Sequence, residues 1–154
     1  MTNNTTFVDF LITSGVAFVL VTLGTLLFNV LLRRMWRYLK RHEHRPHFTM
    51  QLSMLGVFFC HTVVVWMYGL AFWLLVEKFH FGALTGDFPS GHFFTYIYFS
   101  ATTYSSLGFG DIVGHGPVRF LTGVEAINGL ILIGWSVTYT YFATERYLAH
   151  ERKS

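Results

Sequence analysis

Three long apolar runs constrain the fold of this chain more than any other feature of its sequence. They cover residues 10–32, 52–76 and 121–143; the first two contain no Asp, Glu, Lys or Arg, and the third contains one acid, Glu125. Because an α-helix rises about 1.5 Å per residue, each run is long enough to cross a hydrocarbon core of roughly 30 Å. The sequence therefore predicts an all-α membrane protein with three transmembrane helices.

The overall composition agrees with a position in the lipid bilayer. Hydrophobic residues make up 53% of the chain and charged residues only 12%, which is more apolar than an ordinary soluble domain. No basic residue precedes residue 10, so the first run lacks the pattern of a cleaved signal peptide. Cys60 is the only cysteine, which excludes an intrachain disulfide and a cysteine-based metal site.

The positions of the basic residues predict how the chain is oriented. Nine of the eleven Lys and Arg residues lie in residues 33–45 and in the tail after residue 143. Basic residues next to spanning helices are retained on the cytoplasmic side, and three spans bring both segments to the same side. We expect an outside N-terminus, a cytoplasmic C-terminus and a location in the plasma (inner) membrane. The net charge of +3 is then a topology signal and implies no nucleic-acid partner.

The segment between the second and third runs carries a different pattern. Residues 93–105 form an aromatic-rich stretch that is too short to span the bilayer and predicts a re-entrant helix. The sequence SLGFGD follows at residues 106–111, where Gly108 and Gly110 alternate with bulky residues. Glycine adopts positive φ without a steric penalty, so such a backbone can place successive carbonyl oxygens on one side. These oxygens can replace the hydration shell of a monovalent cation, but a single copy has too few of them, which predicts an obligate oligomer.

The SLGFGD motif, preceded by ATTYS, resembles the Thr-Val-Gly-Tyr-Gly-Asp signature of the K⁺ channel pore-domain family, and the resemblance extends over roughly residues 93–143. It implies a homotetramer that conducts K⁺ passively through a fourfold pore, with K⁺ ions in a selectivity filter. It also implies no organic cofactor, no small-molecule substrate and no enzymatic activity. By this resemblance, four residues supply K⁺-binding oxygens: Ser106, Leu107, Gly108 and Phe109. Gly110 and Asp111 would form the outer mouth.

The apolar runs, the positions of the basic residues and this resemblance together divide the chain into five parts. Residues 1–9 are an extracellular N-terminus, residues 10–32 a peripheral transmembrane helix and residues 33–51 a basic cytoplasmic segment. Residues 52–143 are the pore domain, with its outer helix, pore helix, filter and inner helix, and residues 144–154 are a cytoplasmic tail.

Several residues in and before the motif depart from the family pattern. Ser106 replaces the usual threonine and Phe109 the usual tyrosine, which leaves two alternatives open: a weakly selective cation channel or a non-conducting accessory subunit. Within the pore helix, four residues are predicted to support the filter: Tyr98, Phe99, Thr102 and Thr103. Tyr98 and Phe99 stand where the family commonly carries a tryptophan pair, and Thr102 stands where some members carry a glutamate that braces the filter.

Two glycines in the third run, Gly129 and Gly134, lie where the family's inner helix carries its hinge glycines. Small residues also allow helices to pack closely in lipid, so packing is the alternative for either one. If Gly129 is the hinge, the residues on its helical stripe are expected to line the cavity: Ile133, Ser136, Val137 and Thr140.

Ionisable residues near the motif give two modulatory hypotheses. Glu125 is either a gating or filter-bracing residue that hydrogen-bonds to the pore helix, or a residue near the outer interface that reaches water. Three histidines are expected at the outer mouth as candidate proton sensors, His80, His92 and His115, of which His92 and His115 are the candidate modulatory residues, and the alternative is that all are solvated loop histidines.

The remaining histidines suggest weaker alternatives. His61 lies within the second run and could ligate haem in a different class of protein, but the sequence places no second histidine mid-span. Three histidines in the basic segment, next to Glu43, are a weak candidate metal site: His42, His44 and His47.

Overall fold

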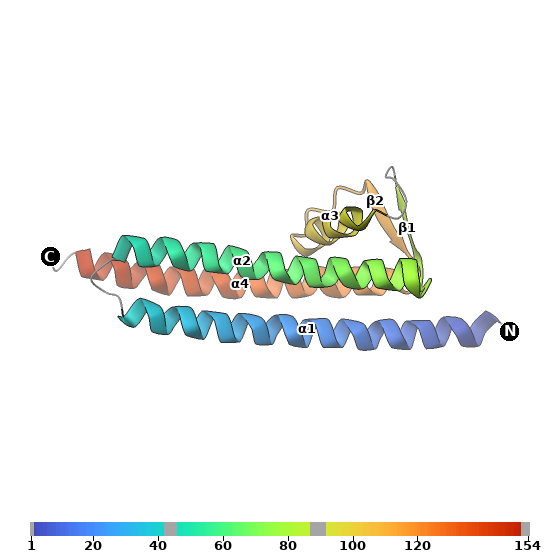
Figure 1. The fold of residues 1–154 in the computed structure, drawn as a ribbon, viewed down its shortest axis with the longest axis horizontal. Helices are drawn as coiled ribbons and strands as arrows, with labels where there is room; N and C mark the ends of the chain where they lie inside the picture. The colour runs from blue at the N-terminus through green and yellow to red at the C-terminus, as the bar shows by residue number, and fades with distance from the viewer. Residues whose placement is uncertain (1, 42–45, 87–91, 152–154) are drawn as a thin grey trace.

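The computed structural model describes residues 2–41, 46–86 and 92–151, and the side chains of residues 7–41, 48–86 and 92–148. In this part of the chain three long helices run side by side (Figure 1): α1 (Thr2–Arg41), α2 (Pro46–Trp73) and α4 (Val118–Glu151). A π-helical turn, η1 (Leu74–Lys78), extends α2. The helices contain three segments long and apolar enough to cross a membrane: Phe7–Arg41, Phe48–Lys78 and Val118–Leu148. The prediction of three spanning helices is confirmed in length and composition.

The helices extend well beyond the apolar runs that predicted them. α1 includes most of the predicted N-terminal segment and continues through the basic residues to Arg41. α2 begins at Pro46, and proline is well suited to the first helical position because it needs no backbone partner there. Arg and Lys are good helix formers, so much of the predicted basic segment at residues 33–51 continues the two helices.

The three long helices alternate in direction. The N-terminus lies at one end of the bundle, and the end of α1, the start of α2 and the C-terminus lie at the other (Figure 1). α1 packs against both α2 and α4. Gly24 lies within this contact, where a Cβ on it would be in ordinary van der Waals contact with Asn128 Nδ2 at 3.5 Å and Val64 Cγ2 at 3.7 Å. Phe28 of α1 and Leu132 of α4 are fully buried in the same contact region.

A small antiparallel sheet joins the segments on either side of residues 92–111. β1 (Ala83–Gly86) pairs with β2 (Ile112–His115), with Ala83 opposite His115 and Gly86 opposite Ile112. The all-α prediction missed this sheet, because each strand has only four residues and too little alternation to reveal a strand. The sheet brings the start and the end of the intervening segment to the same end of the bundle (Figure 1).

Candidate functional site

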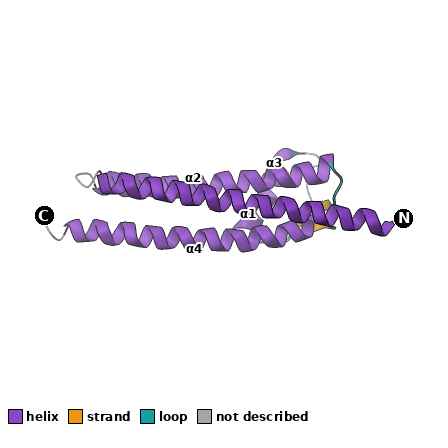
Figure 2. Cartoon of the chain, turned by 90° about the horizontal axis from the view of Figure 1, so that it is seen from below, coloured by secondary structure: helices purple, strands orange, loops and turns teal. Residues whose placement is uncertain are grey.

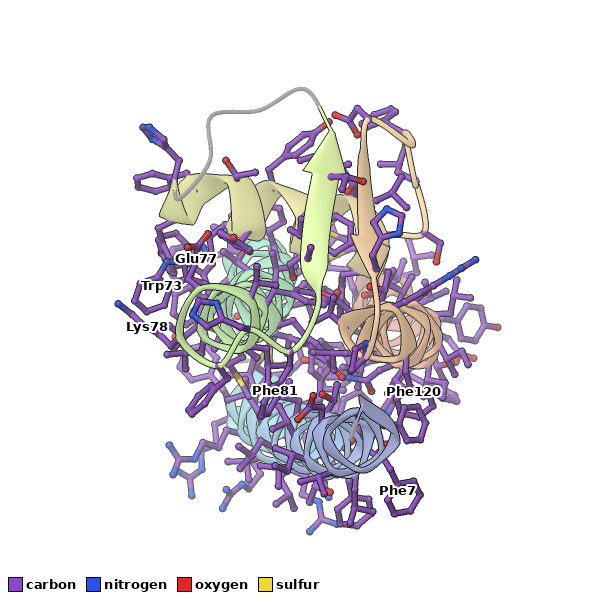
Figure 3. The ribbon with its side chains drawn as sticks, turned by 90° about the vertical axis from the view of Figure 1, so that its right-hand side faces the viewer. Phe7, Trp73, Glu77, Lys78, Phe81 and Phe120 are labelled. Atoms are coloured by element: carbon purple, nitrogen blue, oxygen red, sulfur yellow. The ribbon has the colours of Figure 1, made fainter. Side chains whose placement is uncertain are left out.

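A short helix, α3 (Phe93–Tyr104), packs on α2 and α4 on the side opposite α1 (Figure 3). It begins at residue 93, as the aromatic-rich stretch predicted. Gly69 of α2 allows the two backbones to approach, because a Cβ there would lie 3.0 Å from Ile97 Cα and 3.2 Å from the Tyr96 carbonyl oxygen. The position of α3 therefore depends on small residues in the long helices beneath it.

The two hinge candidates in α4 have different surroundings. A Cβ on Gly129 would collide with the carbonyl oxygen of Tyr104, so this glycine lies at the contact with the end of α3. A Cβ on Gly134 would meet no atom within 4 Å. α4 is one helix over its whole length, so the packing alternative describes Gly129 in this structure, and a hinge at either position stays a prediction.

Glu125 connects α4 to the middle of α3. Its side chain is fully buried, and its Oε1 lies 2.5 Å from Ser100 Oγ, which also lies 2.8 Å from the Val65 carbonyl oxygen of α2. Its other oxygen, Oε2, has no hydrogen-bond partner among the described residues. Within the single chain, Glu125 thus faces α3 and does not reach solvent at the outer interface, which was the alternative prediction.

His61 of α2 contacts both α3 and α4, at the end of α3. Its Nδ1 lies 2.7 Å from the Tyr104 hydroxyl and its Nε2 lies 3.1 Å from Ser136 Oγ. Because Ser136 donates its single proton to the Ile133 carbonyl oxygen at 2.8 Å, Nε2–H of His61 must be the donor to Ser136. In a neutral imidazole Nδ1 is then the acceptor, and Tyr104 donates to it. Both ring nitrogens are engaged, which argues against a haem ligand.

The arrangement at His61 corrects one prediction and adds an unpredicted contact. Ser136 is buried against His61 and does not share a free face with Val137, which is 63% exposed. The predicted cavity stripe is therefore wrong at Ser136, because the helix turns that side chain toward α2. A histidine in an apolar run was itself the available signal, since polar groups within a membrane find one another.

The SLGFGD loop, residues 106–111, starts directly after the end of α3. Two backbone amides of this region donate to α3 carbonyls: Ser106 N to Thr103 O at 2.9 Å and Gly108 N to Thr102 O at 3.1 Å. The Thr102 hydroxyl donates within α3, to the Phe99 carbonyl oxygen at 3.0 Å. Thr102 and Thr103 thus hold the start of the loop through their carbonyl groups, and the Thr102 side chain contacts its own helix.

Every second residue of the loop has a left-handed backbone conformation. The φ angles are 58° at Ser106, 51° at Gly108 and 78° at Gly110. Glycine adopts such angles freely, whereas a left-handed serine costs about 1–2 kcal/mol. Strain of this kind occurs at functional sites where the surrounding structure holds it in place.

The outer end of the loop is held by an unpredicted hydrogen bond. The Tyr98 hydroxyl of α3 donates to Asp111 Oδ2 at 2.7 Å, and Asp111 Oδ1 accepts from the Ile112 amide at 3.1 Å. The hydrogen bond to Asp111 raises the pKa of the Tyr98 phenol. Tyr98 was predicted as an aromatic support, but the structure uses its hydroxyl group.

The loop is uncovered in the single chain. All residues from Ser105 to Asp111 are exposed, including Leu107 at 61% and Phe109 at 64%. A hollow of about 210 Å³ lies between the loop and β2, with Phe99, Thr103 and Phe109 among its lining residues. Exposed non-helical backbone is not tolerated against lipid, so this surface requires a cover that the single chain does not supply.

The histidine hypotheses have mixed outcomes. His115 lies in β2 and its Nε2 is 2.8 Å from Thr85 Oγ1 of β1, and His92 is exposed immediately before α3. Neither placement tests proton sensing. Of the candidate metal site, His42 and His44 lie outside the described residues, as does the side chain of His47. No cluster of three or more metal-ligating side chains occurs among the residues that the structure does describe.

A comparison with protein families identifies the segment that contains this site. A family model described as an ion channel matches residues 54–144, which span most of α2, all of α3, the SLGFGD loop and most of α4. No curated protein and no solved structure matches the chain. Because the family match covers more than half of the chain and includes two of the three apolar helices, this integral membrane protein belongs to the ion channel family.

Proposed function

We propose that the chain is one subunit of a homotetrameric, K⁺-selective channel and that the SLGFGD loop is its selectivity filter. The observation that carries this proposal is the alternation of left-handed residues at positions 106, 108 and 110. Such alternation turns successive carbonyl groups toward one side of the backbone, and rings of backbone carbonyls coordinate K⁺ in place of water. The K⁺-binding oxygens would come from Ser106, Leu107, Gly108 and Phe109.

The depth of α3 supports a re-entrant pore helix. Tyr104 contacts Gly129, which lies about 16 Å along α4 from Val118 at 1.5 Å per residue. The end of α3 would thus lie near the middle of a hydrocarbon core of roughly 30 Å. The negative end of the α3 dipole is then placed close to the start of the loop, where it favours a cation.

The exposed surfaces support a fourfold assembly. The loop requires a water-filled path and neighbouring protein on its open sides, and four copies around an axis supply both. α1 lies on the side of α2 and α4 opposite α3 (Figure 3), which fits a peripheral helix. The cavity would be lined by an exposed stripe of α4, in place of the predicted one: Leu130, Gly134, Val137 and Tyr141.

The proposed orientation follows from charge. The end of α1 and the C-terminal end of α4 lie together (Figure 1) and carry most of the basic residues, which favours a cytoplasmic position in the plasma (inner) membrane. Glu125 and His61 would then brace the pore helix from within the subunit. The five-part division of the chain, with a pore domain at residues 52–143, belongs to the same proposal.

The test is ion flux into liposomes that contain the purified protein. We expect K⁺ gradients to drive flux, Na⁺ gradients to drive much less, and Ba²⁺ to block as an ion of similar size to K⁺. Chemical cross-linking in the same liposomes should trap a tetramer. Equal K⁺ and Na⁺ flux would favour the weakly selective channel, and a tetramer without any flux would favour the accessory subunit.

A further inference from the structure

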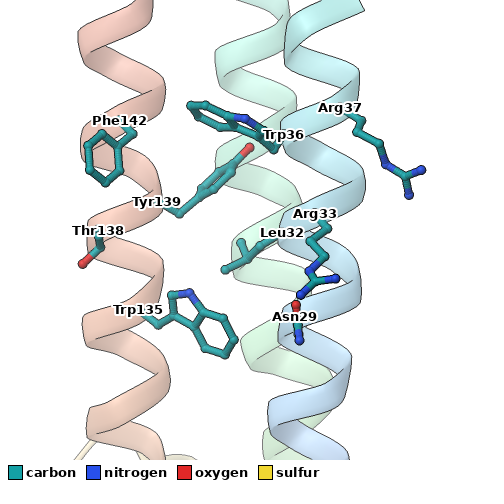
Figure 4. Close-up of a pocket in the computed structure, with 9 residues that line it drawn as sticks. All are labelled: Asn29, Leu32, Arg33, Trp36, Arg37, Trp135, Thr138, Tyr139 and Phe142. Carbon is teal, nitrogen blue, oxygen red and sulfur yellow. The ribbon is translucent and has the colours of Figure 1, made fainter.

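A groove of about 960 Å³ opens between α1 and α4, near the end of the bundle where α1 finishes (Figure 4). Figure 2 shows α1 lying over α2 at this end, with α4 standing apart. Apolar and aromatic side chains line the groove from both helices, among them Leu32 and Trp36 of α1 and Trp135 and Phe142 of α4. The groove could accept a long apolar chain.

Two arginines of α1 lie at the rim of the same groove. Arg33 and Arg37 are among its lining residues, and both are exposed. In Figure 4 the Arg37 side chain extends away from α4. Neither guanidinium forms an ion pair with another of the described side chains. A planar guanidinium suits bidentate binding of a phosphate group.

The position of the arginines along α1 matches a membrane boundary. Arg33 is the first charged residue after the apolar run of residues 10–32, so Leu32 and Trp135 lie on the hydrocarbon side of it and Trp36 close to it. Tryptophan is enriched at the level of lipid headgroups. The groove therefore has an apolar part at hydrocarbon depth and a cationic part at headgroup depth.

The positive charge at this end of the bundle argues against a second copy of the chain as the occupant of the groove. In the sequence, residues 33–45 and 144–154, the segments that include the last turns of α1 and α4, contain nine basic residues and three acidic ones. A neighbouring subunit would bring the same surplus of positive charge and could not neutralise it. A soluble anion such as free phosphate would leave the apolar lining uncovered.

We propose that this groove binds an anionic diacyl phospholipid, with an acyl chain between α1 and α4 and its phosphate on Arg33 and Arg37. The site goes beyond ion conduction and requires no particular ion selectivity. It would make α1 and the inner helix α4 contact the same lipid molecule.

The test uses the tryptophans that line the groove as reporters. A variant with Trp66→Phe and Trp73→Phe keeps Trp36 and Trp135 as its fluorophores, since the chain has four tryptophans. It is placed in vesicles of phosphatidylcholine and phosphatidylglycerol of fixed composition, with bromine on the acyl chains of one lipid or the other. Because two arginines attract an anionic headgroup, we expect brominated phosphatidylglycerol to quench with an apparent affinity at least about tenfold higher than that of brominated phosphatidylcholine.

A matched pair of charge variants distinguishes lipid binding in the groove from general electrostatic attraction of anionic lipids to the basic end of the protein. Arg33→Gln with Arg37→Gln should reduce the preference for phosphatidylglycerol to about that of the bulk bilayer. Arg34→Gln with Arg41→Gln removes the same charge and should retain the preference, because neither residue is among those that line the groove and Arg34 lines a separate pocket with Met35 and Tyr38. Equal losses in the two variants would overturn the proposal, and so would tryptophans that neither brominated lipid quenches, since another protein surface would then cover the groove.

Discussion

Substituting Glu125 with glutamine tests how α3 is joined to α4. Ser100 Oγ lies within hydrogen-bond distance of two acceptors, the Val65 carbonyl oxygen at 2.8 Å and Glu125 Oε1 at 2.5 Å. A hydroxyl carries one proton and can donate to only one of them. The Val65 carbonyl oxygen can only accept, so both contacts are hydrogen bonds at once only when Ser100 donates to Val65 and a protonated Glu125 donates to Ser100 Oγ. The geometry therefore predicts a neutral acid that donates to Ser100.

Glutamine reproduces this pattern of donors and acceptors. Its amide nitrogen would donate to Ser100 Oγ, and its oxygen would take the place of Oε2, which has no partner among the described residues. We expect Glu125→Gln to change the free energy of unfolding by less than about 0.5 kcal/mol, the size of the weakest net hydrogen bond. Glu125→Ala should cost about 2–4 kcal/mol, because it loses the hydrogen bond and leaves a cavity.

Reversible unfolding in mixed detergent micelles, followed by circular dichroism, measures these differences. Ser100→Ala serves as the control, since it removes the hydrogen-bond partner of residue 125. In that background, the chains with and without Glu125→Gln should have equal free energies of unfolding, both lower than that of the wild type. If Glu125→Gln lowered the free energy of unfolding as much as Glu125→Ala, the carboxyl group would be ionised or bound to another partner. The proton assignment at Ser100 would then be wrong.

Three further substitutions test other contacts of α3 and the loop. His61→Phe leaves the Tyr104 hydroxyl without its acceptor and should lower the free energy of unfolding by about 1–3 kcal/mol. Ser136→Ala removes the 3.1 Å contact with His61 Nε2 and the bond from Ser136 to the Ile133 carbonyl oxygen but keeps the 2.7 Å bond between Tyr104 and His61, and should cost less in the same unfolding assay. Gly129→Ala should reduce ion flux in liposomes, since its Cβ would push the end of α3 and the loop away from α4; Gly134→Ala, with no atom within 4 Å of the added carbon, is the control and should leave flux unchanged. The raised pKa of Tyr98 favours the protonated phenol in the folded state, so the bond to Asp111 is fully present below the ordinary tyrosine pKa of about 10 and is lost as the pH rises through the raised value. Titration of Tyr98 should accordingly leave flux unchanged near neutral pH and change it only above about pH 10, and Tyr98→Phe, which lacks the bond at every pH, should abolish that alkaline change.

The sequence predicts the long helices and the loop because their signals are local. The length of each apolar run indicates the length of the helix that can span the membrane, and Gly108 and Gly110 indicate which loop positions can adopt positive φ. Ser106 shows the limit of this reasoning, since its left-handed conformation is not a preference of serine and depends on the carbonyl of Thr103 and the rest of the loop.

The contacts that hold α3 could not be predicted because they join residues far apart in the chain. His61 meets Tyr104 and Ser136 across 43 and 75 positions, and only the packing of α2, α3 and α4 brings them together. The same packing decides which face of α4 is buried. The prediction that residues on the helical stripe of Gly129 line the cavity therefore included Ser136, whereas the structure buries Ser136 against His61.

The reversal potential under bi-ionic conditions tests the central claim most directly, that the alternating loop of residues 106–111 selects K⁺. The protein is placed in a planar bilayer with K⁺ on one side and Na⁺ at the same concentration on the other. We expect the reversal potential of the wild type to be displaced by more than about 59 mV in favour of K⁺, which corresponds to a preference of at least tenfold for a monovalent ion. Gly110→Ala, which forces an alanine to a φ of 78°, should lose the preference or the current. A wild-type reversal potential near zero would contradict the assignment of the loop as a K⁺ filter.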